Sequence, residues 1–195
     1  WKLYSGTLIP LPWNCRPLPL WIRITVSWLP MALPALFSAL RLSHHQTTTV
    51  ARHDVLDGIK NVYIGDRGYC SYNNMAHVVE QGQYFLFRTK DIHSKGLVGN
   101  FNFPDAESFD IDVSVILVRS HSKKVLADIH TEGYIRFVDQ AAAFDYIEYG
   151  SYDTYELSFR ILRFPISTST YECIVTNLPR DEFPVERIKT LYNAR

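Results

Sequence analysis

A strand, an acid, a helix and a second strand follow one another between residues 62 and 88, and this order constrains the fold most. The apolar residues 62–64 predict a short buried strand that ends at Asp66 and a glycine turn. Ser71 is a good N-cap, and apolar residues at three-to-four spacing predict a helix that continues to Gln81. The apolar run 84–88 predicts the next strand. This order is typical of an open α/β sheet, in which reactive groups gather at the strand ends.

Asp66 is the first candidate for a reactive residue, because it closes the first of these strands. A structural role is the alternative. An aspartate that closes a strand before a glycine is commonly a turn former, whose side chain caps the amides that follow. The spacing alone favours this structural role, so other parts of the chain have to decide between the two.

The residues around Asp66 form a block with a recognisable pattern. Asp66, Gly68 and Tyr69 fit the form D-x-G-[YF]. The residues that follow in the block are Ser71, Tyr72, Asn73, Ala76 and His77. This block resembles the one around the second catalytic aspartate of DDE transposases of the insertion-sequence-four type.

A second block lies far along the chain and in the right order. Residues 171–179 resemble the strand before the last catalytic helix of that family, and residues 191–195 begin its Y-x2-R-x3-E-x6-K signature. Tyr192 and Arg195 match the signature, whose glutamate would fall four positions beyond Arg195. The resemblance covers residues 54–195 and implies an α/β fold. The implied fold is an incomplete ribonuclease-H-like core with a β-rich insertion at about residues 91–170.

The resemblance also implies a chemistry and a partner. In this family three carboxylates hold two divalent ions, about 3.5–4 Å apart, for phosphoryl transfer at the ends of insertion sequences. Carboxylate ligands suit Mg²⁺. Asp66 would be a catalytic and metal-binding carboxylate, and Gly68 and Tyr69 would support its turn. Tyr192 and Arg195 would contact DNA. A homodimer of the complete protein and a prokaryotic, cytoplasmic and nucleoid-associated location are implied as well.

Two of the family's three carboxylates have no match in this sequence. The first aspartate usually stands in a D-G-[ST] setting, and the nearest approach to it is Asp57-Gly58. That pair lies nine residues before Asp66, which is too close for a separate strand, so it predicts a turn. The glutamate of the signature is the second one missing. We therefore expect a transposase fragment that is inactive alone.

Residues 1–53 differ in composition from the rest of the chain. They hold no Asp or Glu, whereas they hold all four tryptophans and six of the ten prolines. We interpret this Pro- and Trp-rich segment as non-native or poorly ordered sequence. A membrane anchor at residues 18–42 is the second interpretation, but Pro30 and Pro34 interrupt the apolar run and Arg23 lies inside it. No membrane association is therefore expected.

The middle and the end of the chain also carry predictions. Alternating residues predict strands at 111–118, 134–138 and 155–164, and the acid and proline at 181–184 predict the start of a helix. Val185, Ile188 and Leu191 of that helix should face the core.

Five charged residues on or next to these predicted strands are further candidates. Arg136, Arg160 and Arg163 could meet a DNA backbone, although solvated strand faces are favoured for each of them. Asp110 and Asp112 could share a strand face, and a solvated edge is favoured over a metal pair.

Other functions remain open alternatives. A non-enzymatic nucleic-acid-binding or interaction module on the β-rich region is one, although residues 54–195 carry 15 basic and 20 acidic residues, which does not favour it. A small membrane-anchored protein is another. Cys15, Cys70 and Cys173 lack paired spacing, so the sequence indicates neither a zinc site nor a disulfide framework.

Overall fold

The computed structural model describes residues 2–4, 7–9, 21–26, 37–43, 60–99, 101–104, 106–129 and 133–193. The strands are β1 Lys2–Tyr4, β2 Thr7–Ile9, β3 Trp21–Val26, β4 Phe37–Ser43, β5 Lys60–Gly65, β6 Tyr84–Thr89, β7 Phe109–Val118, β8 Tyr134–Phe137, β9 Thr154–Ser167 and β10 Thr170–Thr176. The helices are the 3-10 turn η1 Arg67–Tyr69 and the α-helices α1 Tyr72–Glu80, α2 Lys123–Asp128 and α3 Val185–Asn193.

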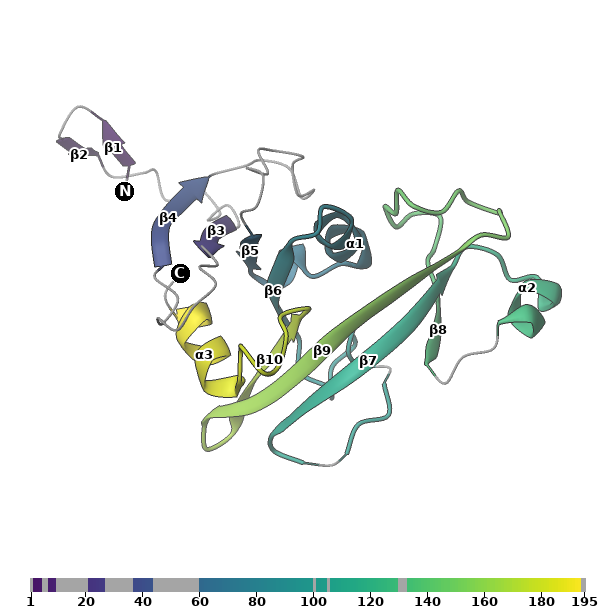
Figure 1. Cartoon of the computed structure of the whole chain (residues 1–195). Coiled ribbons are helices and arrows are strands. Elements are labelled where there is room, and N and C mark those ends of the chain that lie inside the picture. The colour runs from purple at the N-terminus through teal and green to yellow at the C-terminus, as the bar shows by residue number, and fades with distance from the viewer. Residues whose placement is uncertain are drawn as a thin grey trace.

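One mixed sheet of eight strands dominates the fold, in the order β4-β3-β5-β6-β10-β9-β7-β8. The pairs β5–β6 and β7–β8 are parallel, and the other neighbours are antiparallel. Strands β7 and β9 pair over the whole length of β7 and run out to one side of the molecule (Figure 1). The family expectation of an α/β fold is confirmed, with β5, α1 and β6 forming a βαβ unit.

The two longer helices cover opposite faces of this sheet. Helix α1 packs Met75 and Val78 into a cluster that contains Tyr63 of β5 and Phe85 of β6. Helix α3 belongs to a second cluster, which contains Ile64 and its neighbours from β6 and β10. Successive residues of a strand point to opposite faces, so the two clusters lie on the two sides of the sheet.

Local signals explain the βαβ unit. The side chain of Ser71 accepts a hydrogen bond from the backbone N–H of Asn74 at 3.2 Å, so it is the N-cap that the sequence predicts. Gly82 follows α1 with φ of 63°, a conformation that glycine adopts without steric cost. Helix α3 is confirmed too, because Ile188 and Leu191 are 0% and 1% exposed and Val185 packs at the edge of the same cluster.

The expectation of solvated arginines on the strands is wrong. Arg160 and Arg163 are only 4% and 5% exposed, because each has a carboxylate that compensates its burial. Arg163 pairs with Asp91 at 2.8 Å. Arg136 is half-buried, and its guanidinium carbon lies 4.5 Å from the centre of the Phe101 ring. Arg160 and Arg163 are therefore not placed to meet DNA.

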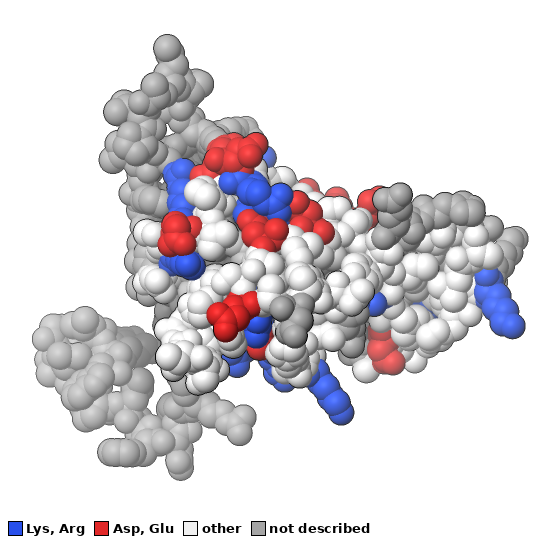
Figure 2. Space-filling model, turned by 90° about the horizontal axis from the view of Figure 1, so that it is seen from below, with Lys and Arg blue, Asp and Glu red and all other residues white. Residues whose placement is uncertain are grey.

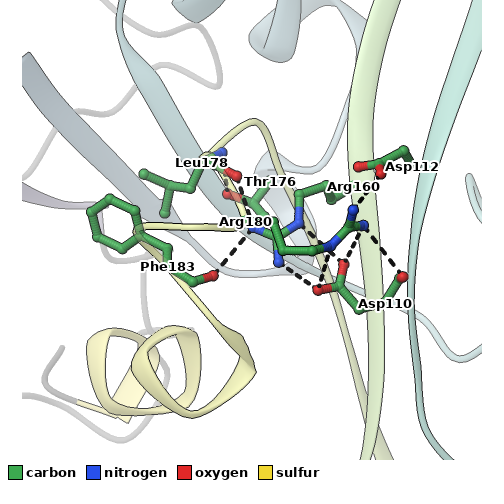
Figure 3. A network of polar contacts seen from close by, with 7 residues as sticks. All are labelled: Asp110, Asp112, Arg160, Thr176, Leu178, Arg180 and Phe183. Atoms are coloured by element: carbon green, nitrogen blue, oxygen red, sulfur yellow. Dashed lines mark hydrogen bonds and ion pairs between the residues drawn. The ribbon is translucent and has the colours of Figure 1, made fainter.

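Asp110 is likewise no solvated edge residue. Its side chain is 15% exposed and pairs with Arg160 at 2.5 Å and with Arg180 at 3.2 Å. Asp112 is 65% exposed and pairs with Arg180 at 2.7 Å. The two aspartates share a strand face, as the sequence predicts, but their partners there are arginines (Figure 3).

Several predictions lie outside the described residues. They include the turn at Asp57-Gly58 and most of residues 1–53, whose interpretation as non-native sequence stays a prediction. Strand β3 of that segment pairs with β5 in the main sheet. Among the residues that the structure describes, no helix is long and apolar enough to cross a membrane.

Candidate active site

Asp66 stands at the carboxyl end of β5. Strand β6 runs parallel to β5, with Gly65 opposite Phe87, so the carboxyl ends of both strands meet at one edge of the sheet. Asp66 occupies the N-cap position of η1, but its side chain makes no capping hydrogen bond. The turn is closed by the backbone instead, where the N–H of Tyr69 donates to the carbonyl of Asp66 at 2.9 Å. The carboxylate is therefore not used as a turn former.

Tyr192 meets this carboxylate from the other end of the chain. Its hydroxyl donates to Oδ1 of Asp66 at 3.4 Å, although the two residues are 126 positions apart. Tyr192 is 5% exposed and lies near the end of α3, where it packs with Ile188 and Leu191. The structure thus brings together one residue from each of the two blocks that the sequence singles out.

Tyr69 packs beneath the turn, and the charge of the Asp66 carboxylate acts on its hydroxyl. Its side chain is 1% exposed and belongs to the cluster on the α1 face. Burial raises the pKa of the Tyr69 hydroxyl, and the negative charge of Asp66 raises it further. The hydroxyl therefore stays protonated at neutral pH.

The two glycines beside Asp66 play different parts. A Cβ atom on Gly68 would meet nothing within 4 Å, and this exposed residue lies inside the 3-10 turn. A Cβ on Gly65 would lie 3.1 Å from Cβ of Tyr69 and 3.2 Å from Cδ1 of Phe87. Close packing against Tyr69 and Phe87 thus requires a glycine at position 65, which the motif does not include. Gly68, which the motif does include, leaves open space next to Asp66.

An ion pair that the sequence did not suggest lies next to this site. Arg88 of β6 donates through Nε to Oε1 of Glu172, whose side chain is 7% exposed. Alternation along the strands places Arg88 on the same sheet face as Asp66, because Leu86 and Ile64 share the α3 cluster. A small cavity of about 160 Å³ between Glu172 and Tyr192 lies in this area. Charged residues inside two apolar strands were the only signal for this pair.

The remaining predicted site residue, Arg195, lies outside the described residues. The described part of the chain contains no group of three His, Cys, Asp or Glu side chains that could hold a metal ion. Mg²⁺ is often held by only one or two carboxylates together with substrate phosphates, and Asp66 fits one such ligand. Asp66 is therefore a candidate for one ligand, and the described residues do not form a three-ligand metal site by themselves.

Acidic and basic side chains are mixed on one face of the described part of the molecule (Figure 2). On the face that Figure 2 shows, acidic and basic side chains lie beside one another rather than in separate fields. Exposed pairs such as Lys189 with Glu186, at 2.8 Å, illustrate this mixing. Mixed charge contributes little to non-specific attraction of DNA.

Comparison with known proteins agrees with this picture. The family described as the transposase DDE domain matches residues 41–195, which is most of the chain. A search of the curated proteins found no match. A search of the solved structures found none either. The matched range includes β5 with Asp66 and α3 with Tyr192. The chain therefore belongs to the transposase DDE domain family.

Proposed function

We propose that Asp66 is a catalytic carboxylate of a DNA transposase of the insertion-sequence-four type, which cleaves and joins DNA at the ends of insertion sequences. One observation carries this proposal. The Asp66 carboxylate stands at the carboxyl end of a strand of the βαβ unit, leaves the following turn uncapped, and is met by Tyr192. The side chain of a turn-forming aspartate would instead accept hydrogen bonds from the backbone amides of η1.

The proposal assigns Asp66 the role of a metal ligand, with Mg²⁺ as the ion. When bound, divalent ions in such sites activate the attacking oxygen and stabilise the leaving oxygen of the phosphate. The chain's own part is to hold the carboxylate in place. Tyr192 does so by donating from its hydroxyl to Oδ1 of Asp66.

DNA would approach the open side of this turn. Gly68 has no side chain, and the space in which a Cβ would stand is free, so a sugar-phosphate backbone can come close to Asp66. Tyr192 and Arg195 match the part of the family signature that lies near the scissile phosphate. Arginine suits that place because its planar fork donates two hydrogen bonds to a phosphate.

We also propose that this chain binds DNA but does not join DNA ends alone. Phosphoryl transfer of this kind needs more than one carboxylate, and the described residues do not bring three potential ligands together. A homodimer of the complete protein belongs to the same proposal. So does a location at the prokaryotic nucleoid, since DNA would be the substrate.

A binding titration with a short blunt DNA duplex of arbitrary sequence tests the DNA contact. We expect Arg195→Ala to weaken binding and to lower the slope of log K against log salt by about 1, because one phosphate contact is lost. Arg187→Ala is the matched control on α3, since Arg187 bonds to the backbone of Glu182 and stacks on Phe183. Equal salt slopes for both variants and the unchanged chain would contradict the DNA contact.

A further inference from the structure

A cluster of polar side chains lies next to the start of α3, around Arg160. Arg160 of β9 donates through Nε and Nη2 to the two oxygens of Asp110, at 3.1 and 2.5 Å. Its Nη1 donates to two backbone carbonyls, those of Leu178 at 2.8 Å and Phe183 at 3.2 Å. Figure 3 shows the guanidinium between the carboxylate on one side and the two carbonyls on the other.

The two carbonyls belong to the turn between β10 and α3. Leu178 follows the end of β10, and its N–H donates to the hydroxyl of Thr176 at 3.2 Å. Phe183 precedes Pro184, whose carbonyl accepts from Ile188 at 3.1 Å in the first turn of α3. Arg160 therefore bonds to the backbone immediately before the helix begins and also to the strand side of the same turn.

Arg180 closes the cluster from the solvent side. It pairs with Asp110 at 3.2 Å and with Asp112 at 2.7 Å. Burial alone would raise the pKa of the Asp110 carboxyl, but hydrogen bonds from Arg160 and Arg180 outweigh it and the pKa is lowered. Asp110 is thus ionised at neutral pH and holds Arg160 against the turn.

The far end of α3 carries the contact with Asp66. The helix has nine residues, from Val185 to Asn193, and is therefore about 13 Å long. Strand β10 is antiparallel to β6, so the turn at its end lies at the opposite edge of the sheet from Asp66, and α3 crosses back between the two edges (Figure 1). A tilt at the start of a rigid helix displaces its end, where Tyr192 reaches the carboxylate.

We propose that Arg160 is a positioning residue for the active site: by fixing the turn before α3 it sets the place of Tyr192 relative to Asp66. The assignment of the active site rests on the proposed function, but the geometric link does not. Asp110 of β7 holds Arg160 of β9 in place through their ion pair. The position of these two strands therefore affects the position of α3, and through α3 the contact with Asp66 at the carboxyl end of β5.

The test uses the whole chain with 3-fluorotyrosine at position 192 and reads its ¹⁹F resonance without DNA or metal. Asp66→Asn first defines the resonance position when the carboxylate is absent. We expect Arg160→Gln to move the resonance of Tyr192 most of the way toward that position. Arg163→Gln is the matched control, because Arg163 is a buried arginine of the same strand that also holds a carboxylate and a carbonyl, those of Asp91 and Ala106.

An unmoved resonance in a folded Arg160→Gln chain, or an equal movement in Arg163→Gln, would overturn the proposal. If circular dichroism shows that Arg160→Gln does not fold, Asp110→Asn replaces it, since it removes the anchor and keeps the guanidinium. That variant must move the resonance in the same direction, and no movement refutes the link. If Arg160→Gln moves the resonance as expected but Arg195→Ala leaves the salt slope of DNA binding unchanged, the proposed function is contradicted and the role of Arg160 in placing Tyr192 still holds.

Discussion

Replacing Gly65 by alanine tests the packing under the turn that follows β5 and carries Asp66. The added Cβ would stand 3.1 Å from Cβ of Tyr69, 3.2 Å from Cδ1 of Phe87 and 3.3 Å from Cδ2 of Tyr69. These rings are 1% and 0% exposed, so neither has free space into which it can move. Gly68→Ala is the matched control two residues beyond Asp66, because its Cβ meets nothing within 4 Å.

The expected magnitude follows from two opposing terms. Overpacking a buried site costs about 1–3 kcal/mol of the free energy of unfolding. Replacing a glycine by alanine raises the free energy of unfolding by about 0.4–1 kcal/mol, because the unfolded chain loses conformational freedom. Gly65→Ala should therefore destabilise the chain by about 1–2 kcal/mol. Gly68→Ala has only the second term, so its free energy of unfolding should rise by up to about 1 kcal/mol.

Urea unfolding followed by circular dichroism measures both variants against the unchanged chain. For a chain of this length the loss at Gly65 corresponds to a fall in Tm of roughly 3–6 °C. The slope m should stay constant, because the exposed surface on unfolding is nearly the same. A Gly65→Ala variant as stable as the unchanged chain would refute the packing argument. So would a Gly68→Ala variant that is destabilised as much as Gly65→Ala.

Three further predictions concern single groups. Ser71→Ala should lower the free energy of unfolding by about 1 kcal/mol, because the N-cap hydrogen bond from the N–H of Asn74 is lost, whereas Ser71→Gly should lower it by only a few tenths. Urea titrations measure both losses, and equal losses would contradict the cap. Burial raises the pKa of the Cys70 and Cys173 thiols to about 12. Iodoacetamide should therefore label both thiols far more slowly at neutral pH in the native chain than in the unfolded chain, as peptide mass spectrometry can measure. Equal labelling rates would contradict this burial. Hydrogen bonds from Arg163 lower the pKa of Asp91 to about 2, below the value near 3.9 of an unfolded chain, so the stability that Asp91 contributes is present above about pH 4 and is lost as the pH falls toward 2. The stability difference between the unchanged chain and Asp91→Asn should therefore shrink over that range, and a constant difference would contradict the ion pair.

The βαβ unit and α3 could be predicted because their signals are local. A serine cap and the spacing of apolar residues both lie within or next to the element that they describe. The same holds for Asp66, whose position at a strand end follows from the run before it and the turn after it. The contact between Asp66 and Tyr192 was not predicted, because no local signal joins residues 126 positions apart, and the resemblance assigned Tyr192 only a contact with DNA.

The buried ion pairs could not be predicted, because each joins residues from distant segments. Arg160 and Asp110 are 50 positions apart, and Arg88 and Glu172 are 84 apart. A charged residue in an alternating strand normally predicts a solvated face, and only the fold shows which of them has a partner. Gly65 was missed for a similar reason, since its tight neighbour Phe87 comes from another strand.

The most direct test of the central claim is the effect of Mg²⁺ on DNA binding by the chain and its Asp66→Asn variant. We measure the dissociation constant for a short blunt duplex with and without Mg²⁺, with Asp139→Asn as the control at an exposed acid. The account predicts that Mg²⁺ tightens binding by the unchanged chain and by Asp139→Asn, and that Asp66→Asn loses this dependence. Without the ion, Asp66→Asn should bind at least as tightly as the unchanged chain, because a negative charge facing the phosphates is gone. If Asp66→Asn keeps the full Mg²⁺ dependence, Asp66 is not a metal ligand and the catalytic assignment fails.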